Sequence, residues 1–248
     1  MAGESVEWRP APERVREKLK GSDRPYVTLK AAISLDGKIA TAKGESQWIT
    51  GEDARQAGHH LRAHHDAVLV GINTVLGDNP RLTVRLPGGL LPGRRPPARV
   101  VLDSGCRIAP QSRCLADDGA RRVVVVGARA DAARVGVLRQ AGVEVIACGD
   151  PRPRPEEFLP ALRRAGLATV FVEGGGQVIA NLIANGEADE LFLFVAGIMI
   201  GGEGPRDWCA GLGVDRLEKA PRLALSPPRL VGKDVILHGL FVPQTAQP

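Results

Sequence analysis

A run of glycines behind a glutamate, Glu173-Gly174-Gly175-Gly176, is the stretch of this sequence best suited to ligand chemistry. It lies between the apolar run Thr169–Val172, typical of a buried strand, and a segment predicted to be helical from Gln177 to Ala184. Glycines let a ligand approach the backbone closely, and the free N–H groups of a helix N-terminus attract anions. The spacing matches neither of the two standard nucleotide motifs, so a plain tight connection remains the alternative. We favour phosphate binding, because three consecutive glycines carry a high entropic cost.

Two arginines, Arg62 and Arg85, are candidates for a second anion site. Guanidinium groups are permanently charged and can grip a phosphate through two parallel hydrogen bonds. Either arginine alone is more often a solvated surface charge. Asp103-Ser104, after a predicted strand, could contact a cofactor ribose or phosphate, or cap a turn.

Four histidines, His59, His60, His64 and His65, fall on one predicted helix. A zinc site would require further ligands, and the segment from His60 to His64 lacks the glutamate of the HExxH motif, so we predict no metal. No nucleophile elbow or Ser/His/Asp spacing is present, which leaves hydrolase chemistry unsupported. Two anion sites without a nucleophile indicate an enzyme whose chemistry comes from a cofactor.

The stretch from Tyr26 to Gly51 looks like the floor and lip of a small-molecule site. Tyr26–Leu29 is a predicted strand, Lys30 places a charge where a buried strand would continue apolar, and two alanines follow. A turn and the run Lys38–Thr41 predict an opening hairpin. A polar loop with a tryptophan then ends at Thr50, the expected N-cap of a helix. An edge hairpin with a surface tryptophan is the alternative interpretation.

Strands and helices alternate along the rest of the chain. This order predicts an α/β fold with a mainly parallel central sheet flanked by helices, and antiparallel strands at the C-terminal edge. The predicted strands are 67–71, 82–84, 99–102, 123–126, 143–147, 169–172, 223–225 and 235–240. The predicted helices are 13–20, 52–65, 131–140, 156–165 and 177–184, with a further helix starting at 73–76 and a loop at 86–97.

The bulk composition is that of an ordinary soluble protein, with 248 residues, 44% hydrophobic and 25% charged. We expect an N-terminal extension, residues 1–24, and one domain, residues 25–248. The net charge of +5 is scattered and aromatic residues are few, which argues against nucleic-acid binding. Four widely spaced cysteines, no signal peptide and no apolar run of the ~20 residues that a bilayer span requires indicate a cytoplasmic protein without membrane contact.

Five segments, in order, resemble the reductase domain of the riboflavin-biosynthesis deaminase/reductase family. They are PYVTLKAAISLDGKIAT, GESQWIT, LRAHHDAVLVGINTVLGDNPRLTVR, RVVLDS and VFVEGGGQVIANLI, and the similarity extends from about Arg24 to Leu240. The resemblance implies a dihydrofolate-reductase-like fold. It also implies NADPH-dependent reduction of the ribosyl group of 5-amino-6-(5-phosphoribosylamino)uracil to ribityl.

The same resemblance implies which residues face each ligand. Ser46, Arg62, Leu82, Arg85 and Glu173 would face the phosphoribosyl substrate. Those that would face NADPH are Ala32, Trp48, Thr74, Asp78, Ser104, Gly175, Gly176, Gln177, Val178, Ile179, Ala180 and Asn181. Lys30 would lie beside both groups, and Lys30 or Glu173 would tune the protonation of a ring-opened imine. Arg129 and Arg134 could meet the 2′-phosphate of the cofactor, although surface charge is the more common role.

Several alternatives stay open at this point. The zinc signatures of the companion deaminase, H-x-E and P-C-x-x-C, do not occur, so we expect a stand-alone reductase acting on the deaminated or the undeaminated pyrimidine, or on a compound of a specialised pathway. A dihydrofolate- or pteridine-type reductase and a catalytically silent nucleotide-binding protein are the other hypotheses. The family, and the apolar segment Leu191–Ile200 at an expected sheet edge, indicate a homodimer.

Overall fold

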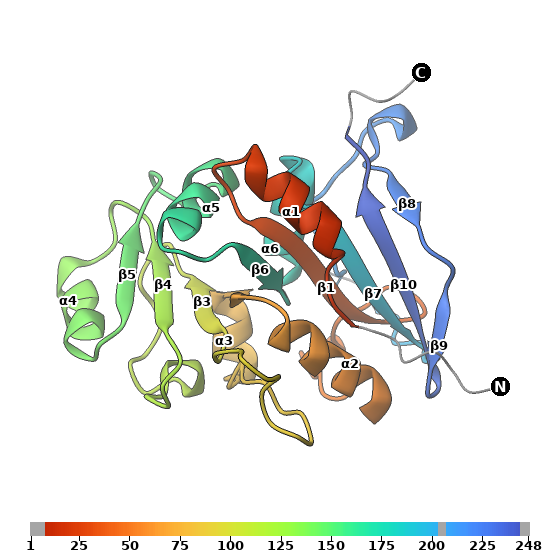
Figure 1. Ribbon diagram of the computed structural model, residues 1–248, viewed down its shortest axis with the longest axis horizontal. Coiled ribbons are helices and arrows are strands. Elements are labelled where there is room, and N and C mark those ends of the chain that lie inside the picture. Colours follow the sequence, from red (N-terminus) through yellow and green to blue (C-terminus); the bar gives the residue numbers. More distant parts are fainter. Residues whose placement is uncertain (1–7, 203–206, 244–248) are drawn as a thin grey trace.

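The computed structural model describes residues 8–202 and 207–243. Its centre is a ten-stranded sheet in the order β5-β4-β3-β2-β6-β1-β7-β10-β8, with β9 also paired to β10 (Figure 1). The strands are β1 (Tyr26–Ser34), β2 (Ala67–Gly71), β3 (Ala98–Leu102), β4 (Arg122–Val126), β5 (Glu144–Ala147), β6 (Thr169–Val172), β7 (Glu190–Ala196), β8 (Leu223–Leu225), β9 (Arg229–Val231) and β10 (Asp234–Phe241). Strands β1 to β7 pair in parallel, whereas β10 pairs antiparallel with β7, β8 and β9. The predicted fold class is confirmed.

Helices cover both faces of this sheet. They are α1 (Pro12–Lys20), α2 (Glu52–Ala63), α3 (Ile72–Asp78), α4 (Ala132–Gln140), α5 (Pro155–Arg164) and α6 (Gly176–Ala184), with short 3₁₀ turns η1 (Arg113–Leu115) and η2 (Leu217–Lys219). Side chains of α5 and α6 share one core cluster with alternate residues of β1 to β4, β6 and β7. Side chains of α2, α3 and α4 share the other cluster with residues of β2, β3, β4, β6, β7 and β10. The period-2 alternation of each strand therefore divides its side chains between two cores.

The opening strand is not half of a hairpin, so that prediction is wrong. β1 pairs in parallel with β6 on one side and β7 on the other. The run Lys38–Thr41 contributes an isolated bridge from Lys38 to Asp207 instead of a ladder. Because β1 lies inside the sheet, its side chains on both faces are covered, and a polar group on it has to face a cavity or a partner.

Three local predictions are corrected by tertiary contacts. The N-cap of α2 is Gly51 rather than Thr50, and the Gly51 N–H donates to Asp234 Oδ2 at 2.7 Å. Residues 82–84 join no strand, because Leu82 has a φ of 55° and the Thr83 carbonyl accepts from the Arg62 side chain. The segment 191–200 is not a sheet edge, since β7 lies between β1 and β10.

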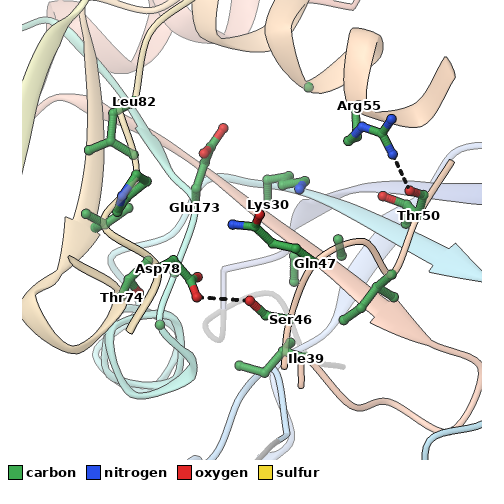
Figure 2. Close-up of a pocket in the computed structure, with 18 of the residues that line it drawn as sticks. Lys30, Ile39, Ser46, Gln47, Thr50, Arg55, Thr74, Asp78, Leu82 and Glu173 are labelled. Atoms are coloured by element: carbon green, nitrogen blue, oxygen red, sulfur yellow. Dashed lines mark hydrogen bonds between the residues drawn. The ribbon is translucent and has the colours of Figure 1, made fainter. Parts of the chain in front are cut away.

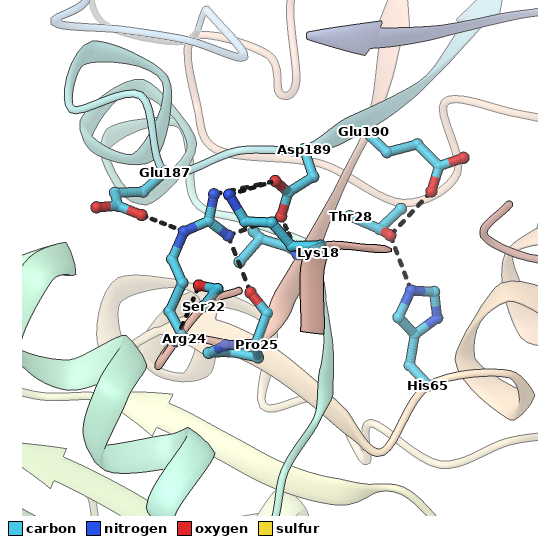
Figure 3. Close-up of polar contacts among 10 residues, drawn as sticks. Lys18, Ser22, Arg24, Pro25, Thr28, His65, Glu187, Asp189 and Glu190 are labelled. Carbon is cyan, nitrogen blue, oxygen red and sulfur yellow. Dashed lines mark hydrogen bonds and ion pairs between the residues drawn. The ribbon is translucent and has the colours of Figure 1, made fainter. Parts of the chain in front are cut away.

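A polar cluster ties the amino end of β1 to the start of β7 (Figure 3). Arg24 donates to both oxygens of Asp189, at 2.7 and 2.9 Å, and also pairs with Glu187. Asp189 accepts in addition from the Val27 backbone N–H at 2.8 Å. These contacts link the segment before β1 to the second half of the chain.

Candidate active site

A cavity of about 570 Å³ opens at the carboxyl edge of the parallel part of the sheet. β1 contributes Lys30 and Ala32, β2 contributes Val70, and Glu173 follows the end of β6. Figure 2 shows Lys30 and Glu173 facing this space between α2 and the loop after β1. Ligands of open α/β sheets bind in such crevices outside the carboxyl ends of the strands.

Arg62 and Glu173 form a two-bonded ion pair in the wall of the cavity. Arg62 Nε donates to Glu173 Oε1 at 2.7 Å and Nη2 donates to Oε2 at 2.5 Å, while Nη1 donates to the Thr83 carbonyl at 2.7 Å. Burial raises the pKa of Glu173, but the Arg62 charge and its hydrogen bonds outweigh burial and hold that pKa below its ordinary value. Glu173 is therefore a carboxylate, and the Arg62 guanidinium is already neutralised by it.

Lys30 is a cavity residue whose charged form is destabilised by its surroundings. Burial lowers its pKa, Glu173 opposes that shift, and the Arg62 charge adds to it. Its Nζ lies 5.1 Å from the centre of the Phe194 ring, and this cation–π contact offsets part of the cost of burying the charge. A lysine with a lowered pKa gives up its proton more readily than an ordinary lysine. The electrostatics thus favour Lys30 over Glu173 as a proton donor.

His59, on α2, is a neutral hydrogen-bonding group in the same wall. Burial and the charges of Arg62 and Arg85 lower its pKa to about 4. Its Nδ1 accepts from the Arg85 backbone N–H at 3.3 Å, so the proton of the neutral ring is on Nε2. His59 therefore fixes the backbone at Arg85 without adding charge to the cavity.

The loop after β1 closes the opposite side of the cavity. Ser46 Oγ donates to Asp78 Oδ1 at 3.0 Å, which joins this loop to the end of α3 (Figure 2). Trp48 is 63% exposed, and the Arg55 guanidinium lies 4.6 Å from the centre of its ring. The lip that the sequence predicts is thus the Trp48 side chain, which the Arg55 guanidinium of α2 contacts.

A second cavity, of about 1050 Å³, adjoins the first, and Ser46, Thr74, Asp78, Gly175 and Gly176 line both. It faces the N-terminus of α6, where the N-cap residue is Gly175 and so has no side chain that could cap the first N–H groups of the helix. A Cβ on Gly176 would lie 2.5 Å from the Asp207 carbonyl oxygen, so only glycine fits there. The free N–H groups at this helix end suit a phosphate of a dinucleotide.

Nearly all the residues expected at the site line these two cavities. The first holds Lys30, Ala32, Ser46, Trp48, Arg62, Thr74, Asp78, Leu82, Arg85, Glu173, Gly175, Gly176 and Ile179. The second adds Ser104, Gln177, Val178 and Asn181. Ala180 is 3% exposed and lines neither cavity, because it lies on the face of α6 turned to the core. Among the described residues, no three side chains of His, Cys, Asp or Glu come together as a metal site.

Several lining residues were missed from the sequence. The first cavity also contains Gln47, His59, Arg81, Arg113 and Trp208, and the second contains Arg107, Arg152 and Arg154. Arg129 and Arg134, suggested for a 2′-phosphate, line neither cavity, and Arg129 pairs with Asp150 at 2.7 Å. The arginines of the second cavity follow β3 and β5, which lie on either side of β4, and only this order of strands brings them to one edge of the sheet.

The fold and the paired cavities define the class: an α/β protein with a two-part ligand cleft at the carboxyl edge of a parallel sheet. A family model described as the RibD C-terminal domain matches residues 25–237. The chain belongs to this family, which confirms the resemblance found in its motifs. No helix in the described part of the chain is long and apolar enough to cross a membrane.

This chain is similar to proteins of about its own length and to part of longer proteins. A "2,5-diamino-6-ribosylamino-4(3H)-pyrimidinone 5′-phosphate reductase" of Methanothermobacter thermautotrophicus is 40% identical over 215 residues, which cover 87% of this chain and 97% of that protein. The "riboflavin biosynthesis protein RibD" of Bacillus amyloliquefaciens is 37% identical over 216 residues, and the chain spans 57% of its length. The structure of Acinetobacter baumannii RibD aligns with a TM-score of 0.78 at 27% identity, over 93% of this chain and 62% of that one.

Proposed function

We propose that this protein is a nicotinamide-dependent reductase of riboflavin biosynthesis. Its substrate would be 5-amino-6-(5-phosphoribosylamino)uracil or the undeaminated diaminopyrimidine, and the ribosyl group would be reduced to ribityl. The observation that carries the proposal is the half-buried Lys30 beside the Arg62–Glu173 pair, in a cavity that adjoins a second cavity facing a free helix N-terminus. The archaeal relative of similar length is named as a reductase of the undeaminated compound, which supports that substrate most directly.

The chemistry we propose is reduction of the ring-opened imine of the ribosylamine. A bound nicotinamide cofactor supplies the hydride for C1′ of the sugar. Lys30 donates the proton to the imine nitrogen, since its lowered pKa makes it a stronger acid than an ordinary lysine. The ionised Glu173 stabilises protonated Lys30 and the cationic imine, and Arg62 holds Glu173 in place. The chain then acts mainly by positioning the two reactants and by setting this proton.

NADPH rather than NADH is the cofactor we propose. Arg107, Arg152 and Arg154 line the second cavity, and Asp78 is its sole carboxylate among the described lining residues. Arg107 Nη2 donates to Asn73 Oδ1 at 3.1 Å and its Nε lies 3.7 Å from Asp103 Oδ1. Arg154 pairs with Glu156 and Glu157, whereas Arg152 makes no ion pair with a described carboxylate. A 2′-phosphate is recognised by arginines, whereas the free ribose hydroxyls of NADH are commonly recognised by a carboxylate. This lining therefore favours the phosphorylated cofactor.

A dihydrofolate- or pteridine-type reductase is the less favoured function. Those substrates lack the phosphoribosyl group, and they would leave the arginines of the first cavity without an anion. We keep as further proposals a single reductase domain at residues 25–248 behind an extension at 1–24, a homodimer, and a cytoplasmic location.

The test is oxidation of NADPH by the purified protein, supplied in turn with the deaminated pyrimidine ribosyl phosphate, the undeaminated compound and dihydrofolate. Turnover with a phosphoribosyl pyrimidine is the expected result, and mass spectrometry should find a product two hydrogens heavier. Oxidation with dihydrofolate alone would overturn the substrate proposal. Binding of NADPH without turnover of any of the three would support a catalytically silent nucleotide-binding protein instead.

A further inference from the structure

The turn that follows β1 is bonded at two separate points to the segment that follows β7. Asp36 in this turn accepts the backbone N–H groups of Ile200 and Gly201, at 3.0 and 2.6 Å. Lys38, at the end of the turn, forms an antiparallel bridge with Asp207, and its Nζ donates to Asp207 Oδ1 at 2.7 Å. Lys38 thereby fixes the position of Asp207 relative to β1.

The backbone at Asp207 and Trp208 packs on Gly176, the first residue of α6. A Cβ on Gly176 would lie 2.5 Å from the Asp207 carbonyl oxygen and 3.2 Å from that of Trp208. Trp208 lines the first cavity and Ala210 the second, whereas Gly176 lines both. The chain at 207–210 is thus a wall shared by the two cavities, and it lies against the helix end that faces the second of them.

Asp207 brings a negative charge close to this helix end. Its carboxylate and its carbonyl group are attached to the same Cα, so the contact of the carbonyl oxygen with Gly176 keeps the carboxylate near the first turn of α6. In the part of the chain that the structure describes, Lys38 is the one cation that pairs with this carboxylate. Without Lys38, a full negative charge would stand beside the helix end.

A dinucleotide would place its diphosphate at this helix end. The free N–H groups of α6 attract an anion, but a bare carboxylate beside them would repel it, because like charges disfavour each other at short distance. The Lys38–Asp207 pair has no net charge, and the Lys38 side chain is only 18% exposed, which keeps the pair from being fully screened by water. The pair therefore preserves the attraction of the helix end for an anion.

We propose that Lys38 is a positioning residue of the cofactor site and acts through Asp207. It holds the wall at 207–210 against α6, and it neutralises the carboxylate that would otherwise repel the diphosphate of the cofactor. The inference rests on the proposed function for the presence of a nicotinamide dinucleotide. Lys38 then sets the affinity for the cofactor and takes no part in hydride or proton transfer. Because NADPH and NADH carry the same diphosphate, Lys38 affects both alike.

The experiment measures the Kd for NADPH and for NADH by calorimetry in the wild type, Lys38→Met, Asp207→Asn and the double variant. Lys38→Met should weaken both cofactors roughly tenfold, because a bare carboxylate is left beside the diphosphate. Asp207→Asn in the Lys38→Met background should restore the affinity, since it removes that charge, and Lys38→Arg should keep it. Lys43→Met, exposed in the loop after β1 and outside both cavities, is the matched control and should bind as the wild type does.

Salt and turnover separate an effect of charge from a loss of structure. The difference in Kd between Lys38→Met and the wild type should shrink at ~1 M salt, where the Debye length is about 3 Å. With saturating cofactor, kcat for the phosphoribosyl pyrimidine should stay near the wild-type value.

Three results would overturn the inference while leaving the proposed function in place. They are an unchanged Kd in Lys38→Met, a double variant that binds as weakly as Lys38→Met, and a loss confined to NADPH. The second result would indicate a purely structural role, and the third a contact with the 2′-phosphate. The expected pattern of Kd values without reduction of any pyrimidine would overturn the proposed function alone.

Discussion

The two ends of β1 handle charge in opposite ways. At the amino end, Arg24 meets Asp189 and Glu187, and Thr28 donates to Glu190 while also contacting His65 (Figure 3). Toward the carboxyl end, Lys30, the central residue of β1, lies in a cavity where arginines outnumber carboxylates. Both ends are built by the same strand in the same sheet. The difference indicates that the amino end is matched for stability, whereas the carboxyl end is left unmatched for a charged ligand.

Replacement of Lys30 tests the carboxyl end and should have the largest effect. Lys30→Met should lower kcat by ~10²–10⁴-fold, the usual contribution of a positioned proton donor. In the wild type, kcat should fall as pH rises through the lowered pKa of Lys30, because the donor must be protonated. Steady-state rates across pH measure both. Lys43→Met, exposed in the loop after β1, is the control, and near-normal turnover of Lys30→Met would contradict the donor role.

Replacement of Arg24 tests the amino end. Arg24→Met leaves Glu187 without its cation and Asp189 with only Lys18, 3.4 Å away, and it should lower the free energy of unfolding by about 3–5 kcal/mol. The kcat of the folded variant should stay near that of the wild type, since Arg24 lines neither cavity. Urea unfolding with parallel assays makes the comparison. Arg16→Met on exposed α1 should change stability by less than about 1 kcal/mol, and a similar loss there would argue against a special role for Arg24.

The buried histidine beside Thr28 makes stability depend on pH. Burial lowers the pKa of His65 from 6.5 to about 4, so below pH 6.5 the unfolded chain takes up a proton that the folded chain refuses. Stability is therefore lost as pH falls, by ~2 kcal/mol from this group between about pH 7.5 and about pH 5. His65→Gln should remove that part of the loss in urea titrations at the two pH values. His60→Gln, in the last turn of the helix that precedes His65, should not, and an unchanged pH dependence of the His65 variant would contradict the assignment.

The smallest predicted effect concerns the second cavity. Arg152→Ser should reduce the preference for NADPH over NADH about tenfold, which is the loss of roughly one charge-assisted hydrogen bond. The ratio of kcat/KM for the two cofactors measures it. Arg129→Ser is the matched control. Arg129 pairs with Asp150 outside the cavity, so this variant should keep the wild-type ratio. A loss of NADPH preference in Arg129→Ser, with none in Arg152→Ser, would instead support recognition of the 2′-phosphate by Arg129.

The amino-acid sequence alone determined the class of fold and most of the elements. The apolar runs at Ala67–Gly71, Val123–Val126 and Thr169–Val172 are short, β-branched strands separated by helical segments, and this order permits little except a parallel sheet. The glycine run at the start of α6 and the motif residues of the family could also be identified from the sequence. The conformation that a glycine run permits depends on the glycines themselves and not on distant partners. Elements whose partners lie far along the chain were predicted less well. Thr50, residues 82–84 and the supposed edge at Leu191–Ile200 all depended on such partners.

Tertiary structure alone decided which charges meet. Arg62 and Glu173 are 111 positions apart, and no local pattern indicates that they neutralise each other. Their pairing lowers the pKa of Glu173 and neutralises the charge of Arg62 in the wall of the cavity. Coulomb interactions depend on distance and burial in space, whereas a sequence records only separation along the chain.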